Sequence, residues 1–274
     1  EELVGWKKSQ YLDKPYEGRS EFFEAHWSRI SGMVTNPYLV ADAIYYNMRS
    51  FAAEGMLYLE AQVPVRHYVK PDGSAFAPDE VMEIFRQRLK QADAKATGVT
   101  VRFQWAILRF SPSAEDDLRA GYDFVARTPE YVGVNMVGRE DNDKGYPLRF
   151  LKTLRELRHK YSNVRLSIHA GEVDEPNHHV RETLLLGADR IGHGVNLITD
   201  PDTMLLMRHG PYMVEINLVS NLLLEYVSDY AQHPFPEYLR TGIPVALSTD
   251  DRGMWDSTLT DEFFVAVTEF DLNW

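Results

Sequence analysis

The chain has 274 residues, of which 44% are hydrophobic and 26% are charged, and its formal net charge is -12. This composition is typical of a globular protein with a large core, and the acidic balance argues against a nucleic-acid partner because it repels phosphate backbones. Cysteine is absent, which excludes disulfides, thiolate metal ligands and a catalytic cysteine. No run approaches the roughly 20 apolar residues of a membrane span. The compartment, cytoplasmic or exported, stays open.

Short apolar runs alternate with amphipathic stretches along the chain. The runs that read as strands are 56–63, 99–108, 132–137, 164–169, 189–193, 212–218 and 244–249. The stretches that read as helices are 36–55, 78–96, 114–127, 147–161 and the residues from Ser257 onward. Regular alternation of strands and helices predicts a parallel sheet covered by helices.

The number of strands favours a particular α/β architecture. Seven strands are one short of a closed (β/α)8 TIM barrel, which needs eight. We therefore expect a single barrel domain over 1–274 whose first strand lies upstream of Glu1, so that the chain is truncated at its N-terminus and at its C-terminus. An open doubly wound sheet is the alternative, but no glycine-rich phosphate loop follows an early strand.

Three polar motifs lie at the C-terminal ends of predicted strands. They occupy 167–172 (SIHAGE), 190–194 (RIGHG) and 248–251 (STDD). Active sites of barrels and of open α/β sheets form at this end. Hydrolytic deamination needs a metal-activated water, a carboxylic acid that protonates a ring nitrogen, and a base that orients the water. The His, Glu and Asp side chains of the motifs match these tasks.

Each motif also has a structural interpretation. A single His at a strand end is usually a hydrogen-bonded structural residue, Gly-His-Gly can be a tight turn, and the adjacent Asp250 and Asp251 can cap the helix that follows. The adjacent His178 and His179 read as loop or surface residues. Taken singly, each motif favours structure; together they occupy the same end of the fifth, sixth and eighth strands of the expected barrel, which favours a shared site.

The motifs HAGE, RIGHG and STDD, in this order and at this spacing, resemble the adenosine/AMP deaminase family. The likeness continues at 133–140 (GVNMVGRE) and at 219–221 (VSN). The segment 224–242, which contains His233-Pro234, is most similar to the adenosine-deaminase-related growth factor branch. The resemblance implies a barrel of the amidohydrolase type with a Zn²⁺ cofactor.

By this resemblance, His169 and Asp250 are expected to be zinc ligands. The family takes two more ligands from a His-x-His pair on its first strand, and none of the nine histidines here has that spacing. We therefore expect the two further histidines upstream of Glu1, and weak zinc binding by the 274 residues alone.

The resemblance also implies the catalytic and substrate-binding residues. Glu172 would bind the purine and protonate its ring nitrogen, and His193 would orient the attacking hydroxide. Asp251 and the backbone N–H of Gly138 would contact other edges of the purine. Ser220 and Asn221 are expected to support their loop rather than to touch substrate, and the aromatic residues Phe22, Phe23, Trp27 and Trp255 either wall the pocket or pack in the core.

The implied function is adenosine or 2′-deoxyadenosine deaminase, in which zinc-bound hydroxide attacks purine C6 and gives inosine and ammonia. The partner would be a small-molecule purine nucleoside, and a homodimer stays open. Alternatives are AMP, adenine or a modified adenosine as substrate, or a non-catalytic growth-factor-like barrel. AMP ranks lower because its phosphate needs a basic pocket, and the motif loops are poor in Lys and Arg apart from Arg139 and Arg252.

Overall fold

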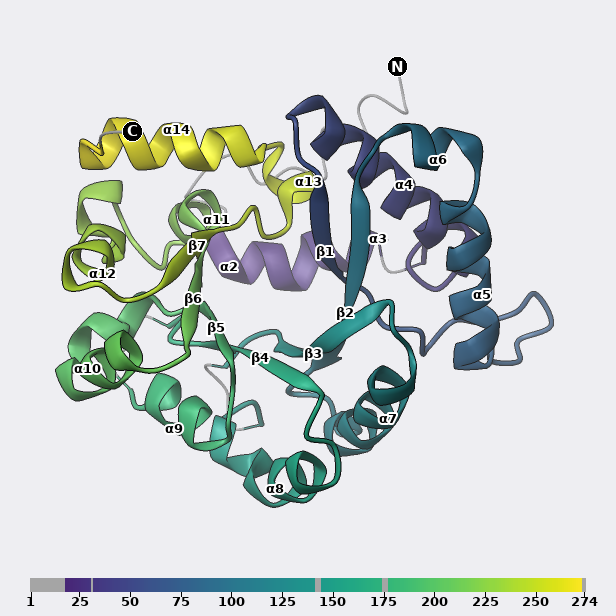
Figure 1. The fold of residues 1–274 in the computed structure, drawn as a ribbon, viewed down its shortest axis with the longest axis horizontal. Coiled ribbons are helices and arrows are strands. Elements are labelled where there is room, and N and C mark those ends of the chain that lie inside the picture. The colour runs from purple at the N-terminus through teal and green to yellow at the C-terminus, as the bar shows by residue number, and fades with distance from the viewer. Residues whose placement is uncertain (1–17, 31, 141–143, 174–176, 273–274) are drawn as a thin grey trace.

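The structure is a computed structural model that describes residues 18–30, 32–140, 144–173 and 177–272. Its centre is one sheet of seven parallel strands in the sequential order β1-β2-β3-β4-β5-β6-β7. The sheet curls so that the strands lie inside a layer of helices (Figure 1). The strands are β1 (Tyr58–Gln62), β2 (Thr100–Leu108), β3 (Tyr131–Val137), β4 (Arg165–Ala170), β5 (Arg190–His193), β6 (Met213–Ile216) and β7 (Val245–Leu247).

All seven predicted strands are therefore confirmed, with ends displaced by at most two residues. The longer helices of the outer layer are α4 (Pro37–Ala53), α5 (Pro78–Leu89), α7 (Ala114–Arg127), α8 (Leu151–Lys160), α10 (Pro201–His209) and α14 (Leu259–Phe270). The shorter ones are α6 (Ala92–Ala96), α9 (His179–Leu185), α11 (Leu218–Leu223), α12 (Phe235–Thr241) and α13 (Arg252–Trp255). Short helical turns are η3 (Pro147–Phe150), η4 (Val195–Thr199) and η5 (Tyr230–Gln232).

The predicted helix over 78–96 is interrupted. It ends at Leu89 and resumes at Ala92, because Gln91 is extended with φ -66° and ψ 153°. The break brings Asp93 back to Arg88, which donates two hydrogen bonds of 3.0 Å to its carboxylate. This ion pair links residues five apart, and sequence periodicity does not reveal it.

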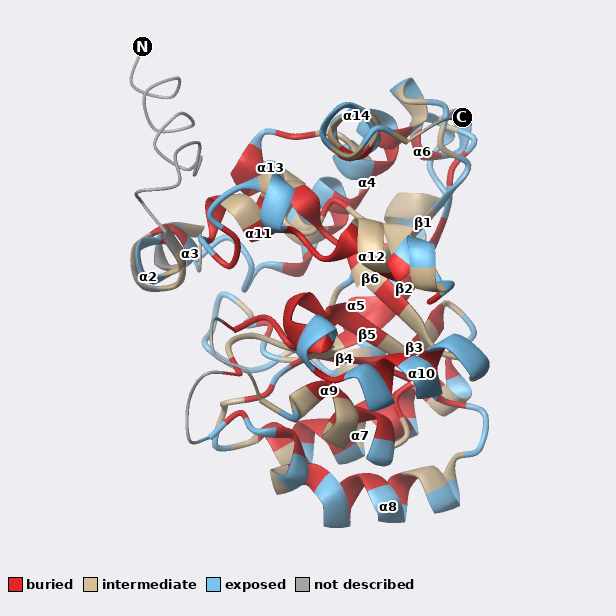
Figure 2. Ribbon diagram, turned by 90° about the vertical axis from the view of Figure 1, so that its left-hand side faces the viewer, coloured by how far each residue is buried: buried red, intermediate tan, exposed pale blue. Residues whose placement is uncertain are grey.

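Strand β2 shows how the alternating pattern places the core. Phe103, Trp105 and Ile107 are buried, and Trp105 packs on α7, where an added Cβ at Gly121 would lie 2.9 Å from Trp105 Cδ1. Alternate residues such as Gln104 point to the inside of the curl, where Gln104 donates to Glu60. Figure 2 shows the buried layer running through the strands and the inward faces of the helices.

The two edges of the sheet are β1 and β7. Among the described residues, β1 pairs with β2 alone and β7 pairs with β6 alone. Sequential order excludes a doubly wound sheet, whose strand order reverses at a switch point. A curled sheet of seven parallel strands inside a helical layer confirms the predicted barrel class.

The segment of α2 (Gly18–Glu21), the π-helix η2 (Phe22–His26) and α3 (Trp27–Ile30) lies beside α11 and α13 (Figure 2). Phe22 is buried there, with its ring centroid 5.0 Å from that of Trp255. The other members of this cluster are Leu223, Leu224, Tyr226 and Met254. Phe22 and Trp255 therefore pack in a second, smaller core. In the part of the chain that is described, no helix has the length and apolar character needed to cross a membrane.

Candidate active site

The three motifs meet at the C-terminal end of the sheet. His169 is the fifth residue of β4 and His193 the last residue of β5, and the register pairs His169 with Gly192. The two imidazole rings lie 4.8 Å apart between centroids, at 63°. Gly192 makes this approach feasible, because a Cβ there would lie 3.0 Å from His169 Nδ1.

Carboxylates from β4 and β7 complete the cluster. Glu172 follows β4 and Asp250 follows β7, and one ligand atom from each lies within 4.8 Å of one from His193. Glu172 Oε1 is 3.2 Å from His193 Nδ1, and Asp250 interacts electrostatically with His169. Glu172, His193 and Asp250 are close enough together to hold a metal ion, and Asp250 is the member of this trio that was also expected as a ligand.

The backbone at these strand ends adopts unusual conformations. His193 has φ 66°, Gly194 φ 58° and Asp250 φ 50°, all in the left-handed region that non-glycine residues seldom occupy. Such conformations concentrate at functional sites, where the surrounding structure enforces them. The Gly-His-Gly segment is a tight turn, as the structural interpretation predicted. The side chain of His193 in this turn is nevertheless buried in the cluster.

Burial shifts the proton affinities of the cluster. Burial, with the nearby His193, lowers the pKa of His169 to about 3, and burial, with His233, lowers the pKa of His193 to about 3. Burial raises the pKa of Asp250, and burial together with Asp250 raises the pKa of Asp251 well above its ordinary value. The groups favour their neutral forms because no strong counter-charge offsets their desolvation.

Asp251 does not cap the helix that follows it. It occupies the N-cap position of α13, but its side chain makes no capping hydrogen bond. The N-cap interpretation of Asp251 is therefore wrong, and its carboxylate interacts electrostatically with that of Asp250. Gly138, the other expected purine contact, follows β3 with φ 88°, and a Cβ there would lie 2.8 Å from Leu108 Cδ1. A larger residue at position 138 would clash with the Leu108 side chain, so this position requires glycine.

Two asparagines contact His193 at Nδ1, the ring nitrogen that also faces Glu172. Asn217 donates through its side-chain nitrogen to the carbonyl of Ser248 at 3.0 Å, and its oxygen accepts from His193 Nδ1 at 2.9 Å. The Asn221 amide lies 3.2 Å from the same Nδ1 and 3.2 Å from His233 Nε2. The supporting role expected of Asn221 agrees with these contacts.

The sequence analysis did not single out a buried arginine at the strand ends that form the site. Arg109, directly after β2, is fully buried and donates to the carbonyl of His169 and, at 2.7 Å, to that of Gly145. A lone arginine after a strand matches no motif. The signal available was its place directly behind a strand of buried residues, at the same end as the motifs.

Glu140 is a second buried residue near the site whose role the sequence did not indicate. Its carboxylate accepts from the backbone N–H of Glu172 and lies 2.8 Å from His179 Nδ1. His179 is half-buried and begins α9, so its interpretation as a surface residue is wrong, whereas His178 is exposed. The contacts of Glu140 with His179 on α9 and with the backbone N–H of Glu172 therefore hold the segment that carries Glu172.

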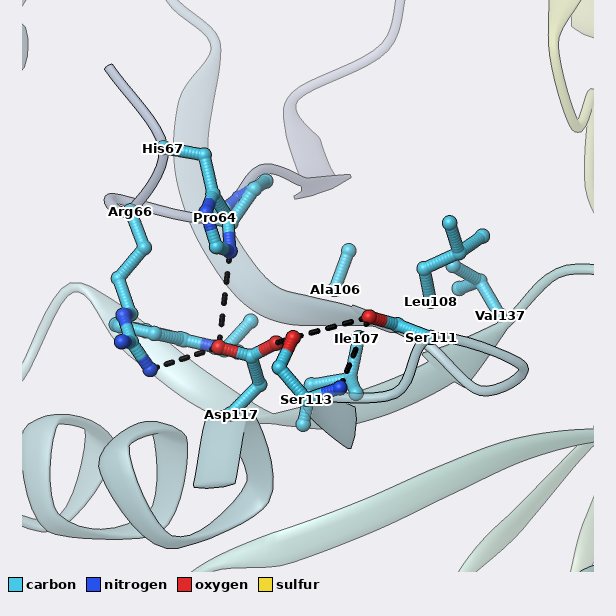
Figure 3. A pocket seen from close by; sticks show the side chains of 11 residues that line it. Pro64, Arg66, His67, Ala106, Ile107, Leu108, Ser111, Ser113, Asp117 and Val137 are labelled. Carbon is cyan, nitrogen blue, oxygen red and sulfur yellow. Dashed lines mark hydrogen bonds and ion pairs between the residues drawn. The ribbon is translucent and has the colours of Figure 1, made fainter. Parts of the chain in front are cut away.

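A groove of about 250 Å³ opens at the C-terminal end of β2, lined by residues of β2, of the segment after β1 and of α7 (Figure 3). Leu108 and Val137, the last residues of β2 and β3, are among its lining residues. At its rim, Arg66 donates to Asp117 at 2.7 Å, and Ser113 donates to the same carboxylate at 2.9 Å. The cation at this rim is thus paired with a carboxylate.

Comparison with known proteins identifies the family. A family profile described as "Adenosine deaminase" matches residues 14–274. The chain belongs to the adenosine deaminase family. It is 27% identical over 228 residues to N6-methyl-AMP deaminase-L of Xenopus laevis, covering 82% of this chain and 63% of that protein. It is 28% identical over 236 residues to adenosine deaminase of Enterococcus faecalis, covering 85% of this chain and 66% of the relative. The chain therefore spans about two thirds or less of these relatives.

Solved structures share the fold. The adenine deaminase of Arthrobacter aurescens superposes with a TM-score of 0.79 at 20% identity, covering 97% of this chain and 77% of that one. Arabidopsis ADAL complexed with IMP gives a TM-score of 0.81 at 22% identity, covering 98% of this chain and 77% of the other. A Zn-bound amidohydrolase of Burkholderia ambifaria gives 0.73 at 21%, covering 87% and 65%. These matches confirm the amidohydrolase-type α/β fold.

Proposed function

We propose that the protein is a hydrolytic deaminase of adenine-containing compounds, and that its substrate is adenosine or 2′-deoxyadenosine. The observation that carries the proposal is the convergence of Glu172, His193 and Asp250 within 4.8 Å, in a chain of the adenosine deaminase family. Relatives named as adenosine, adenine and N6-methyl-AMP deaminases support the shared chemistry, the loss of an amine from an adenine ring.

The donor set fits a zinc ion. His169 is held neutral by burial, and its Nδ1 has no hydrogen-bond partner among the described residues. Neutral imidazole and carboxylate are zinc ligands, and the chain has no thiolate to offer. We assign His169 and Asp250 as ligands, and a solved relative binds Zn. A zinc ion in this position would supply a water that ionises near neutral pH.

The other residues of the cluster divide the proton transfers. Glu172, buried beside His193, donates the proton that the purine ring nitrogen takes up as water adds to the adjacent carbon. His193, held at its Nδ1 side by Asn217 and Asn221, orients the attacking water. Asp251 and the Gly138 backbone N–H bind the remaining edges of the purine. The amine leaves as ammonia, and the ring carbon keeps the oxygen of water.

The charges around the site favour a nucleoside over a nucleotide. Arg252 donates to Glu54 at 2.8 Å, with both side chains only 11% exposed, and Arg66 is paired with Asp117. These two cations are already neutralised, so they attract a phosphate weakly. AMP-like substrates are the second candidate, because relatives are named for N6-methyl-AMP or were solved with IMP or GMP.

Ultraviolet absorbance tests the proposal directly. The full gene product, supplied with zinc, is given adenosine, 2′-deoxyadenosine, adenine, AMP and N6-methyl-AMP in parallel. We expect the highest kcat/KM for adenosine or 2′-deoxyadenosine. Preference for a nucleotide would overturn the substrate assignment but keep the chemistry. No conversion of any compound by zinc-bound protein would overturn the deaminase and favour a non-catalytic barrel.

A further inference from the structure

Glu262 is a fully buried carboxylate that the reaction scheme does not use. It lies in the first turn of α14, with 0% exposure. Its Oε2 accepts from the backbone N–H of Leu218 at 2.8 Å and its Oε1 from that of Val219 at 3.2 Å. No ion pair to Glu262 occurs among the described residues. Burying a carboxylate without a cation is costly, so its two backbone donors need a structural or functional reason.

These donors are the first two residues of α11. The first N–H groups of any helix lack partners within the helix. Asn217 occupies the N-cap of α11, but its side chain makes no capping hydrogen bond. Its amide is turned instead to His193 and the Ser248 carbonyl. Glu262, 43 and 44 residues away in sequence, therefore supplies the cap that Asn217 does not.

Helix α11 connects two sides of the active site. The Ser220 side chain interacts with Asp250, the residue after β7 that we assign to the metal, and its hydroxyl donates to the Asn217 carbonyl at 3.4 Å. The Asn221 amide lies 3.2 Å from Nδ1 of His193, at the end of β5. Ser220 and Asn221 are both fully buried. The position of this six-residue helix thus sets the orientation of both groups.

We propose that Glu262 is a positioning residue for the deamination: its carboxylate fixes the start of α11, and α11 orients Asp250 and His193. This inference rests on the proposed function for its kinetic consequence but not for its structural part. A carboxylate is required because it presents two acceptor oxygens. An amide presents one acceptor and one donor, and the donor would face a backbone N–H.

The test compares three variants of the full protein. Glu262→Gln keeps the size of the side chain and removes one acceptor, and Glu262→Asp keeps both acceptors on a shorter stem. Glu269→Gln is the matched control, because Glu269 is an exposed residue of the same helix. For each variant, zinc affinity, kcat, KM and the hydrogen exchange of the Leu218 and Val219 amides are measured.

We expect Glu262→Gln to speed exchange at Leu218 and Val219, to weaken zinc binding by about 10-fold, and to lower kcat by about 10- to 100-fold with little change in KM. Glu262→Asp should recover part of each loss, and Glu269→Gln should match the wild type. A lower melting temperature with unchanged zinc affinity and unchanged kcat per folded molecule would overturn the proposal, because it would show a purely structural cap.

Two arms keep the outcomes separable. If Glu262→Gln does not fold, Ser220→Ala removes the α11 hydroxyl that interacts with Asp250, together with its 3.4 Å hydrogen bond to the Asn217 carbonyl. Weaker zinc binding in that variant supports the proposal, and unchanged binding overturns it. If the wild type deaminates no adenine compound, the proposed function fails, whereas exchange and zinc affinity still decide whether Glu262 positions α11 and Asp250.

Discussion

Two levels of ionisable side chains face the inside of the curled sheet, and they differ in how their charges are balanced. The lower level, here called the charged layer, consists of Glu60 on β1, Arg190 on β5 and Glu215 on β6. Arg190 donates to Glu60 at 2.7 Å and to Glu215 at 3.3 Å. The upper level is the active-site cluster. Arg190 and His193 belong to the same strand, three residues apart, so the levels are about 10 Å apart.

The proton affinities follow this difference. Burial opposes the charge of Glu60, but its hydrogen bond and attraction to Arg190 lower its pKa below the ordinary value, and the two carboxylates raise the pKa of Arg190. Burial dominates at Glu215 and raises its pKa despite Arg190. In the cluster, burial lowers the pKa of His193 to about 3 and raises that of Asp250. The charged layer is built for stability, whereas the cluster carries a desolvation cost that a bound cation and substrate would offset.

Replacing Glu172 tests the cluster most severely. Glu172→Gln should reduce kcat by roughly 100- to 10,000-fold, because the amide cannot donate an acidic proton, while zinc stays bound and the melting temperature is unchanged or higher. Steady-state kinetics and zinc analysis measure both. Glu156→Gln on the exposed face of α8 is the control. Full activity of Glu172→Gln would refute its role as general acid.

Acid should weaken the stabilising contribution of the buried histidines before it weakens that of Glu60. The folded pKa of His233 is lowered by burial to about 4 and that of His193 to about 3, from 6.5. Their stabilising contribution is therefore present above pH 6.5 and is lost as pH falls toward 4 and 3, by up to about 1.4 kcal/mol per unit and histidine. Glu60, with a lowered pKa, begins to lose its contribution only near its ordinary value of 4.5.

Urea unfolding of zinc-free protein between pH 7 and pH 4 measures this order. His233→Gln should flatten the slope between pH 6.5 and 5, because the amide can replace both histidine hydrogen bonds without taking up a proton. Equal slopes for the wild type and His233→Gln between pH 6.5 and 5 would contradict the lowered pKa of His233.

Removing the arginine of the charged layer should affect stability rather than chemistry. Arg190→Met leaves Glu60 and Glu215 without their cation, at a cost of about 2 kcal/mol in the free energy of unfolding. Because the cluster lies a level above, kcat per folded molecule should stay within about 2-fold of wild type. Arg165→Met is a control, since Arg165 is an exposed neighbour at the start of β4. A large loss of kcat without a loss of stability would contradict the assignment of the charged layer to stability and of the cluster to catalysis.

The mildest change concerns the space between the two histidines. Gly192→Ala would place a Cβ 3.0 Å from His169 Nδ1 and 3.3 Å from its Cα. We expect the His169 ring to shift and zinc affinity to fall by about 10-fold, with a smaller effect on unfolding than Arg190→Met. Calorimetric zinc titration measures the loss. Unchanged affinity would show that the His169 ring position does not depend on Gly192.

The sequence by itself determined the seven strands, most of their flanking helices and the end of the sheet where the motifs meet. This was possible because alternation, turn residues and strand-end motifs are local: His169 and Glu172 lie three residues apart, and so do Arg190 and His193. The break at Gln91 was not predicted, because the helical pattern of 78–96 continues through it and the Arg88–Asp93 ion pair forms only once the chain has turned back.

Only the tertiary structure decided which distant residues serve the site. Arg109 reaches the His169 carbonyl across 60 positions, Arg190 meets Glu60 across 130, and Glu262 caps α11 across 44. None of these pairs carries a spacing that a sequence pattern can report. Burial is a property of the whole fold, and it is burial that makes the histidines neutral and leaves the carboxylates of Asp250 and Asp251 poorly compensated.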